Sequence, residues 1–294
     1  MKPAPSRATA ASVLAINWYP GHMVTARKEA AEALRSIDVV IEVLDARVPR
    51  SSCNPEFEAL RRHNQRPALK LLNKADVADP ARTQAWLAHY NAQPGVRAIA
   101  LSARKRGDVA KIPSEALALA PTRTTRIKPL RMMILGIPNV GKSTLMNTLL
   151  GRRLADVGDE PAITKHVTRY ELGPTMSLVD TPGMMWKGVA QDIALKLAAT
   201  HSIGRNAYDD ASVAFDLARL LLADYPGLLE ARYGALPAGP AATPALDGPG
   251  LIAAIATRRA LVMRGGGPDL ERAASLLLKE FRDGTLGAIT LETP

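Results

Sequence analysis

Residues 136–143 constrain the possible folds of this chain more than any other segment. They read GIPNVGKS, a complete G-x-x-x-x-G-K-S motif, directly after an apolar run at 130–135 and before the amphipathic segment TLMNTLLG. Between a strand and a helix, the backbone N–H groups of such a loop curl round phosphate oxygens, and the helix N-terminus adds its positive dipole. These flanks argue against a chance glycine-rich turn. The motif therefore predicts a phosphate-binding loop.

Two side chains of this loop carry the expected chemistry. Lys142 supplies a point charge to the outer phosphates of a bound nucleotide, and Ser143 ligates Mg²⁺. The nucleotide-binding residues expected in and beside the loop are Pro138, Asn139, Val140, Gly141, Lys142, Ser143 and Thr144.

Short apolar runs alternate with helical patterns over much of the chain, as expected for a parallel sheet covered by helices. The six candidate strands lie at 38–45, 68–72, 96–101, 130–135, 168–172 and 176–179. The fifth, TRYEL, alternates polar and apolar residues, which is typical of an edge strand with one solvated face. We therefore expect residues 17–188 to form an α/β domain with a six-stranded, mostly parallel sheet.

Beyond Gly188 the pattern becomes helical, so residues 189–294 are expected to form a small all-helical domain. The expected helices lie at 190–201, 212–224, 251–263 and 269–282. Residues 234–250 are rich in Pro, Gly and Ala, which favours an exposed loop. Residues 1–16 are rich in Ala, Pro and Ser and are expected to be disordered, although basic residues without an acid also resemble an organelle transit peptide.

Two short motifs at strand ends indicate recognition of guanine. Asn73, Lys74 and Asp76 belong to NKAD, which follows the second predicted strand. A carboxylate at Asp76 can accept the ring N–H and the exocyclic amine of guanine, and adenine offers no such pair of donors. Asn73 would steady this loop and Lys74 would cover the base with its aliphatic stem. Ser102 and Ala103 end the third strand, where a backbone N–H can donate to the guanine carbonyl oxygen.

The segment Asp180-Thr-Pro-Gly183 ends the sixth strand and supplies the expected metal and γ-phosphate contacts. Asp180 lies at the carboxyl edge of the sheet, where it can reach the Mg²⁺ shell. Gly183 can bring its N–H close to a γ-phosphate because it has no side chain. Thr164, in a loop before the edge strand, can also ligate Mg²⁺. An ordinary turn and a solvated loop remain the alternatives for these two segments.

The order of these motifs differs from that of an ordinary GTPase. NKAD and Ser102-Ala103 precede GIPNVGKS, and DTPG comes last, whereas the phosphate-binding loop ordinarily comes first. All six strands are still present, and a chain can be recut at its loops when the native termini lie close together. The sequence therefore predicts a circularly permuted P-loop GTPase domain.

Several motifs in this order resemble the YlqF/RbgA family of ribosome-biogenesis GTPases over roughly the whole chain. They are NWYPGHM at 17–23, DARVP at 45–49, NKAD, GIPNVGKST, P-x-I-T and DTPG, with FRDGTLG at 281–287 similar to the family's C-terminal helical domain. The resemblance implies a GTP hydrolase that binds GTP, GDP and Mg²⁺ and assists assembly of the large ribosomal subunit, whose precursor and rRNA are its partners. Ala162 departs from the family pattern, which has glycine there.

The resemblance also suggests how water is activated. Met184 stands where Ras-like enzymes place a water-orienting glutamine, and similar family members use a histidine that maps to His22. An imidazole can orient water or accept its proton near neutral pH, although His22 could equally cap a helix or contact RNA. Asn139 is similar to a residue that ligates K⁺ in cation-stimulated relatives, so potassium dependence is expected.

The formal net charge of +10 favours an anionic partner, and nucleic acid is the leading candidate. Basic clusters at 104–106, 123–131 and 258–259, with Arg264, are candidate RNA contacts, although solvated faces explain each cluster equally well. No apolar run reaches 18 residues, and Cys53 is the only cysteine. We expect a monomer without a membrane partner in the cytoplasm, with the mitochondrial matrix as the alternative.

Two other functions remain open at this stage. One is a GTP-gated RNA-binding module whose hydrolysis is incidental, which the missing glutamine allows. The other is a GTPase that acts on tRNA or on a membrane surface.

Overall fold

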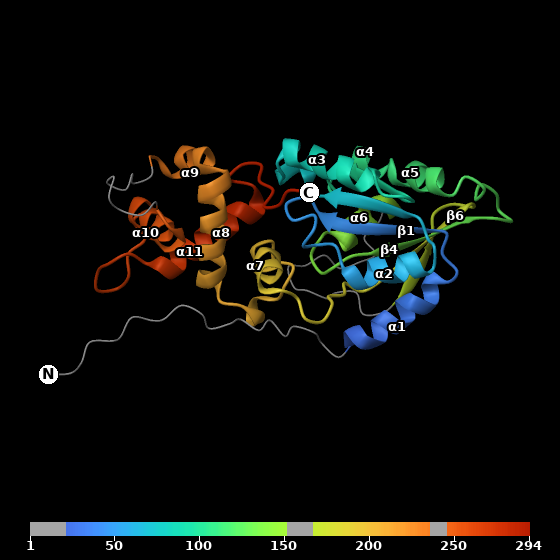
Figure 1. Ribbon diagram of the computed structural model, residues 1–294, viewed down its shortest axis with the longest axis horizontal. Coiled ribbons are helices and arrows are strands. Elements are labelled where there is room, and N and C mark those ends of the chain that lie inside the picture. The colour runs from blue at the N-terminus through green and yellow to red at the C-terminus, as the bar shows by residue number, and fades with distance from the viewer. Residues whose placement is uncertain (1–21, 152–166, 236–245) are drawn as a thin grey trace.

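The computed structural model of the chain describes residues 22–151, 167–235 and 246–294 (Figure 1). A sheet with its covering helices forms one end of the molecule, and a group of helices forms the other. Within the described residues no helix is both long enough and apolar enough to cross a membrane.

The sheet has the six strands that the sequence predicts. They are β1 (Val39–Asp45), β2 (Ala68–Asn73), β3 (Val96–Ala100), β4 (Leu130–Leu135), β5 (Thr168–Glu171) and β6 (Met176–Asp180). Their spatial order is β3-β2-β1-β4-β6-β5, and all neighbours are parallel except β5, which runs antiparallel to β6 at the edge. The predicted edge strand is therefore confirmed.

The centre of the sheet is buried on both faces, which explains why its strands read as nearly continuous apolar runs. Every residue of β1 is buried, and β1 pairs with β4 from Val39 opposite Met132 to Glu42 opposite Leu135. This pairing places the strands that precede the guanine motifs next to the strands that precede the phosphate motifs. Their carboxyl ends consequently meet at one edge of the sheet.

Among the described residues of this part, six α-helices accompany the strands. They are α1 (His22–Leu34), α2 (Pro55–His63), α3 (Pro80–Asn91), α4 (Arg106–Val109), α5 (Ile112–Leu119) and α6 (Lys142–Leu150). Asn54 and Asp79 cap α2 and α3 by accepting backbone N–H bonds, and each helix has proline in its first turn. By contrast, α6 starts after Gly141 without a side-chain cap. Its first N–H groups are thus available to an anion.

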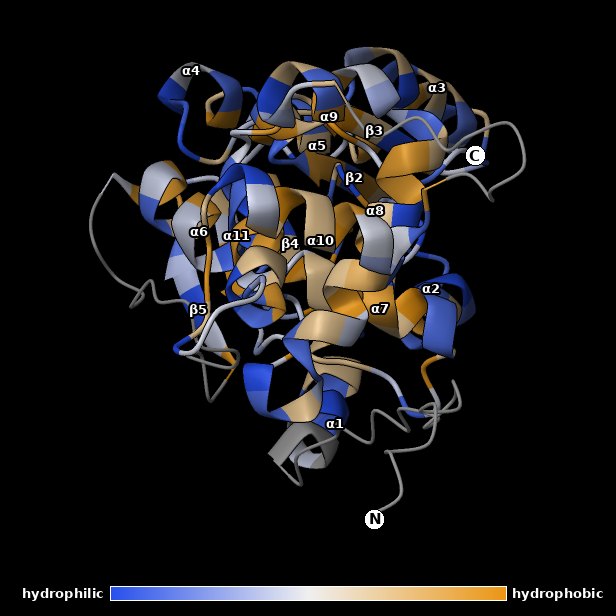
Figure 2. Ribbon diagram, turned by 90° about the vertical axis from the view of Figure 1, so that its left-hand side faces the viewer, coloured by the Kyte–Doolittle hydropathy of each residue, from blue (hydrophilic) through white to orange (hydrophobic). Residues whose placement is uncertain are grey.

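Five further α-helices form the other part, as far as the structure describes it. They are α7 (Gln191–Ala199), α8 (Asp210–Asp224), α9 (Pro226–Tyr233), α10 (Gly248–Arg258) and α11 (Leu270–Asp283). In the view from this end, orange apolar residues occur on α7 and α10 and blue hydrophilic residues on α2 and α4 (Figure 2). The residues that α7, α8 and α10 bury include Leu197, Leu217 and Ile255. One apolar cluster runs from Ile41 of the sheet through Leu197 to Leu221, so the two parts share a core.

The structure corrects the predicted loop at 234–250. Residues 236–245 lie outside the described residues, but Gly248 begins α10 and Asp247 caps it by accepting from Gly250 N–H at 2.8 Å. A Cβ on Gly248 would lie 2.2 Å from the carbonyl oxygen of Phe215. Glycine here lets α10 approach α8 closely, which composition alone does not distinguish from flexibility.

The last residues of the helical half pack back onto the sheet half. Ile289 N–H donates to the carbonyl of Val77 at 3.1 Å, and Leu291 N–H donates to the carbonyl of Arg47 at 2.7 Å. The indole N–H of Trp86 donates to the carbonyl of Glu292 at 3.1 Å. The segment after α11 therefore covers the loops that follow β1 and β2.

Candidate nucleotide-binding site

A cleft of about 770 Å³ opens where the carboxyl ends of the strands meet the helical half, a volume typical of ligand sites. Most of the residues expected to bind nucleotide line this one cleft. They are Asn73, Lys74, Asp76, Ser102, Ala103, Pro138, Asn139, Gly141, Lys142, Ser143, Thr144 and Gly183. Segments separated by about a hundred residues in the chain thus share one wall.

The loop at 136–143 has backbone geometry that requires glycine at two positions. Gly141 has φ +101°, and a Cβ there would lie 2.2 Å from the Nδ2 of Asn73. A Cβ on Gly136 would lie 2.7 Å from the carbonyl oxygen of Val43. Both glycines therefore let the loop pass close to neighbouring groups and wrap around a small space.

Lys142 is buried within this loop. Its Nζ donates to the carbonyl oxygens of Gly136 at 2.9 Å and Ile137 at 2.7 Å. Burial lowers the pKa of Lys142 to about 8, against the opposing attraction of Asp180. An ammonium group with so little water around it is well suited to bind phosphate oxygens.

Val140 differs from the other residues expected in this loop. Its side chain is fully buried in the apolar core and does not line the cleft. Its carbonyl oxygen accepts from the Nδ2 of Asn73 at 2.7 Å. Val140 can therefore face a ligand only through its backbone.

Asn73 fastens three loops together. Its Nδ2 binds the phosphate loop through Val140, and its Oδ1 accepts from the N–H of Ala103 at 2.8 Å. The hydroxyl of Thr148 in α6 donates to the carbonyl of Ala103 at 2.8 Å. The NKAD loop, the Ser102-Ala103 turn and the phosphate loop are thus joined by hydrogen bonds within the protein.

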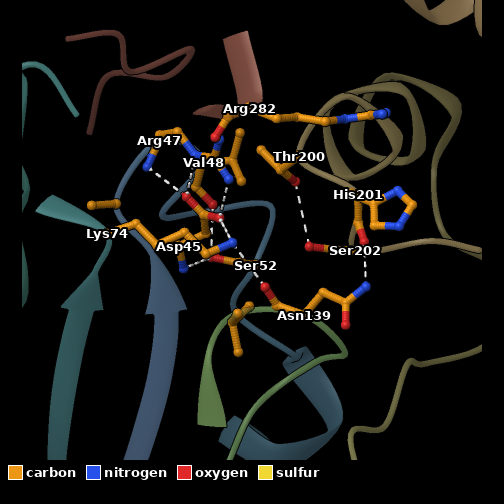
Figure 3. Close-up of polar contacts among 12 residues, drawn as sticks. Asp45, Arg47, Val48, Ser52, Lys74, Asn139, Thr200, His201, Ser202 and Arg282 are labelled. Carbon is orange, nitrogen blue, oxygen red and sulfur yellow. Dashed lines mark hydrogen bonds and ion pairs between the residues drawn. The ribbon is translucent and has the colours of Figure 1, made fainter. Parts of the chain in front are cut away.

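Lys74 crosses from the NKAD loop to the phosphate loop (Figure 3). Its Nζ donates to the carbonyl of Asn139 at 2.8 Å and lies 2.9 Å from an oxygen of Asp45. Burial alone would raise the pKa of Asp45, but the charges of Arg47 and Lys74 outweigh it and hold that pKa well below its ordinary value. The carboxylate of Asp45 is consequently ionised and fixes Lys74 over the site.

The residues expected to ligate Mg²⁺ fit that ion where they are described. Asp180 is buried, and its Oδ1 has no hydrogen-bond partner among the described residues. Burial raises the pKa of Asp180 to about 6, against the attraction of Lys142. Ser143 lines the cleft, whereas Thr164 lies outside the described residues. Carboxylate and hydroxyl oxygens are ligands that hard cations accept.

The DTPG segment approaches the phosphate loop closely. A Cβ on Gly183 would lie 3.0 Å from the Cα of Pro138 and 3.1 Å from the Nζ of Lys142. Met184 and Met185, which follow, are buried in two different apolar clusters. This packing gives the methionines a structural role. His22 is the first residue of α1, and its side chain is not among the described groups.

The helical half contributes residues that sequence reasoning missed. The cleft residues of the helical half are Thr200, His201, Arg205, Ser275, Lys279, Arg282 and Asp283, and Arg47, Val77 and Arg104 line the cleft from the sheet half. The Nδ2 of Asn139 donates to the carbonyl of His201 at 2.8 Å, directly after α7 (Figure 3). No local pattern marks these residues, because their proximity to the motifs comes only from packing of the two halves.

Comparison with known proteins finds relatives and solved structures that match nearly the whole chain. A family described as "50S ribosome-binding GTPase" matches residues 131–239. The chain is 37% identical over 292 residues to ribosome biogenesis GTPase A of Priestia megaterium, covering 96% of this chain and 98% of the relative. It is 31% identical to mitochondrial ribosome-associated GTPase 1 of Mus musculus, with 94% and 89% covered. GNP-bound YlqF from T. maritima superposes with a TM-score of 0.60 at 26% identity, covering 92% and 98%.

Proposed function

The chain belongs to the YlqF/RbgA family of ribosome biogenesis GTPases, and on that premise we propose that it binds a precursor of the large ribosomal subunit in a GTP-dependent manner. It is a GTP hydrolase that acts in ribosome assembly. The observation that carries the proposal is the meeting of the guanine and phosphate motifs in one cleft, one wall of which is the helical half. GTP and GDP are its ligands, and a nucleotide bound in the cleft would therefore contact both halves.

The positions of the residues support the following proposed roles in hydrolysis. Lys142 neutralises phosphate charge, Asp76 recognises guanine, and Gly183 offers its N–H to the γ-phosphate. Ser143, Asp180 and Thr164 would hold Mg²⁺, which supplies charge neutralisation at the β- and γ-phosphates. The buried partnerless oxygen of Asp180 supports this assignment.

Turnover measured with and without purified large ribosomal subunits tests the proposed partner. We expect subunits to raise turnover and to retain more protein with a GTP analogue than with GDP. Stimulation by tRNA or by lipid vesicles instead would contradict the proposal. Unchanged turnover together with GTP-dependent retention on subunits would favour a binding module whose hydrolysis is incidental.

His22 is proposed to orient the attacking water. The substitution His22→Ala should lower subunit-stimulated turnover and leave GTP affinity unchanged. His89→Ala is a matched control, because His89 lies on α3 and its ring contacts Gln93 outside the cleft. Undiminished turnover in the His22 variant, or loss of nucleotide binding, would reject this role.

A potassium ion is proposed to act beside Asn139, which lines the cleft and has φ +58°. Replacing potassium by sodium at constant ionic strength should then reduce turnover. Equal rates in the two salts would reject a specific cation.

The rRNA contacts are proposed to lie on exposed basic residues of both halves. Arg123 and Arg131 are paired with Asp38 at 3.1 and 3.0 Å, which leaves Arg126 and Lys128 as the exposed cations of that cluster.

We propose residues 17–188 as the GTPase domain and residues 189–294 as the ribosome-binding domain. Crosslinking of the GTP-analogue-bound protein to cellular RNA tests these assignments.

The helical half is proposed to move when the γ-phosphate is lost, because α7 starts eight residues after Gly183. The angle between the halves, or RNA protection by the helical half, should then differ between GTP-analogue and GDP states. Identical readouts would contradict this.

We propose a cytoplasmic location, with the mitochondrial matrix as the alternative, since relatives include bacterial and mitochondrial proteins. Cell fractionation distinguishes the two.

A further inference from the structure

The DARVP segment at the end of β1 contains a buried ion pair that the proposed hydrolysis does not use. Arg47 is 1% exposed. Its Nε and Nη2 donate to the two carboxylate oxygens of Asp45 at 2.9 and 2.8 Å, and its backbone N–H donates to Oδ1 at 3.0 Å (Figure 3). This two-pronged geometry fixes the plane of the guanidinium group, which a lysine could not reproduce.

One side of this pair faces the guanine loop. Asp45 also holds the Nζ of Lys74 at 2.9 Å, and Lys74 donates to the carbonyl of Asn139 in the phosphate loop. Any change in the NKAD loop that moves Lys74 therefore changes the charge balance around Asp45. Arg47 itself lines the cleft.

The other side of the pair faces the helical half. The Nη1 of Arg47 donates to the carbonyl of Arg282 at 3.2 Å, at the end of α11. The guanidinium lies 5.2 Å from the centroid of the Phe281 ring, within cation–π range. The carbonyl of Arg47 accepts from Leu291 N–H at 2.7 Å. Arg47 is thus held by both halves of the molecule.

We propose that Arg47, held by Asp45, is a positioning residue that couples binding of a guanine nucleotide to docking of α11 against the sheet half. A ligand that fixes the position of Lys74 and the NKAD loop also fixes the Asp45–Arg47 ion pair. This pair in turn fixes the position of the end of α11. Coupling between two sites is reciprocal, so docking of α11 strengthens nucleotide binding by the same factor. This inference rests on the proposed nucleotide site but adds a residue and a direction of communication to it.

Buried ion pairs are a weak source of stability but can specify a geometry. Removing Arg47 alone leaves Asp45 buried with only Lys74 as counter-charge, and the variant risks misfolding. Removing both members, as Asp45→Asn with Arg47→Met, avoids a buried carboxylate that has lost Arg47 but leaves Lys74 with its bond to the Asn139 carbonyl and without its carboxylate partner. Comparing the single variant with the double variant separates a loss of coupling from a loss of stability.

The test is hydrogen exchange of the full-length chain with and without GDP, followed in peptides that cover residues 279–291. In the unsubstituted protein, GDP should slow exchange there by roughly fivefold or more, the lower range of measured couplings. Arg47→Met, Arg47→Lys and the double variant should lose this protection and lose GDP affinity by a similar factor. Arg50→Met is the matched control, because Arg50 contacts Thr293 on the same face without touching Asp45.

The outcomes separate this inference from the proposed function. If the unsubstituted protein binds no guanine nucleotide, the proposed function itself is wrong. If it binds GDP and either Arg47 variant keeps the full protection ratio, the coupling is wrong, because a merely structural residue lowers stability without changing that ratio. Should the Arg47 variants not fold, Phe281→Leu removes the aromatic contact, together with some buried side-chain volume, and decides by the same readout, with retained protection refuting the coupling.

Discussion

Replacing Asn73 by alanine would remove the side chain that fastens the phosphate loop to the Ser102-Ala103 turn, whereas the bond from Lys74 to the Asn139 carbonyl would remain. Asn73 is 2% exposed, donates to the carbonyl of Val140 at 2.7 Å and accepts from the N–H of Ala103 at 2.8 Å. Alanine can make neither bond. The variant therefore leaves two backbone groups without their partners, one in each loop.

The cost follows from the burial of these groups. A buried hydrogen-bonding group left without a partner costs about 1–3 kcal/mol, so the free energy of unfolding should fall by roughly 2–5 kcal/mol. A nucleotide must then order both loops as it binds. We expect GDP affinity to fall by roughly 10- to 100-fold, equivalent to about 1.4–2.8 kcal/mol of binding free energy.

Urea unfolding and titration with a fluorescent GDP measure the two effects separately. Asn91→Ala provides a matched control, because Asn91 makes the same pair of bonds to the backbone of Ala98 at 2.8 and 3.2 Å. Those bonds join α3 to β3 outside the cleft. The control should lose stability and keep its GDP affinity.

Two results would refute this reasoning. One is an Asn73 variant that is destabilised yet binds GDP as tightly as the unsubstituted protein, which would mean that the Asn73 side chain does not preorganise the loops. Alternatively, Asn91→Ala could weaken GDP binding as much, which would trace the effect to general destabilisation.

Three further predictions concern other parts of the protein. Asp76→Asn replaces an acceptor of two guanine donors by an amide, so GTP affinity should fall by roughly 100-fold or more while xanthosine triphosphate competes better in a displacement assay. Gly183→Ala places a Cβ 3.0 Å from the Cα of Pro138. Turnover should fall by about 100-fold with GDP affinity nearly unchanged, as steady-state kinetics and titration can check. Burial would raise the pKa of Glu58, but hydrogen bonds from Arg61 and neighbouring charges hold it at about 2, below its ordinary 4.5. Since the folded pKa is the lower one, the stabilisation is present above pH 4.5 and is lost as pH falls toward 2. Glu58→Gln should therefore cost about 2–3 kcal/mol at pH 7, and urea unfolding should show a smaller cost at pH 3; a constant gap would contradict the assignment.

The sheet and its motifs could be predicted because their signals are local. Each strand carries its own apolar run, and the carboxyl ends of parallel strands meet at one edge. NKAD and GIPNVGKS were thus expected to meet there without any knowledge of tertiary contacts. The antiparallel edge strand β5 was visible in its alternating pattern for the same reason.

The helical half was harder to predict because its important contacts are distant in the chain. α9 spans eight residues, of which only Leu229 and Tyr233 are buried, too few for a clear helical period. The pairing of Arg47 with the end of α11 joins residues 235 positions apart. Nothing in either local sequence identifies the other. The same reason explains why His201 and Lys279 were not expected in the cleft.

Ile127 lies on the connection between α5 and β4 and is 92% exposed. Every residue assigned to guanine recognition precedes this connection, and every phosphate-loop residue follows it. A backbone cut at Ile127 would therefore yield two polypeptides, each with an incomplete binding surface, that can rejoin along the β1–β4 seam. A guanine nucleotide would bridge them, so the ligand itself would drive fragment complementation.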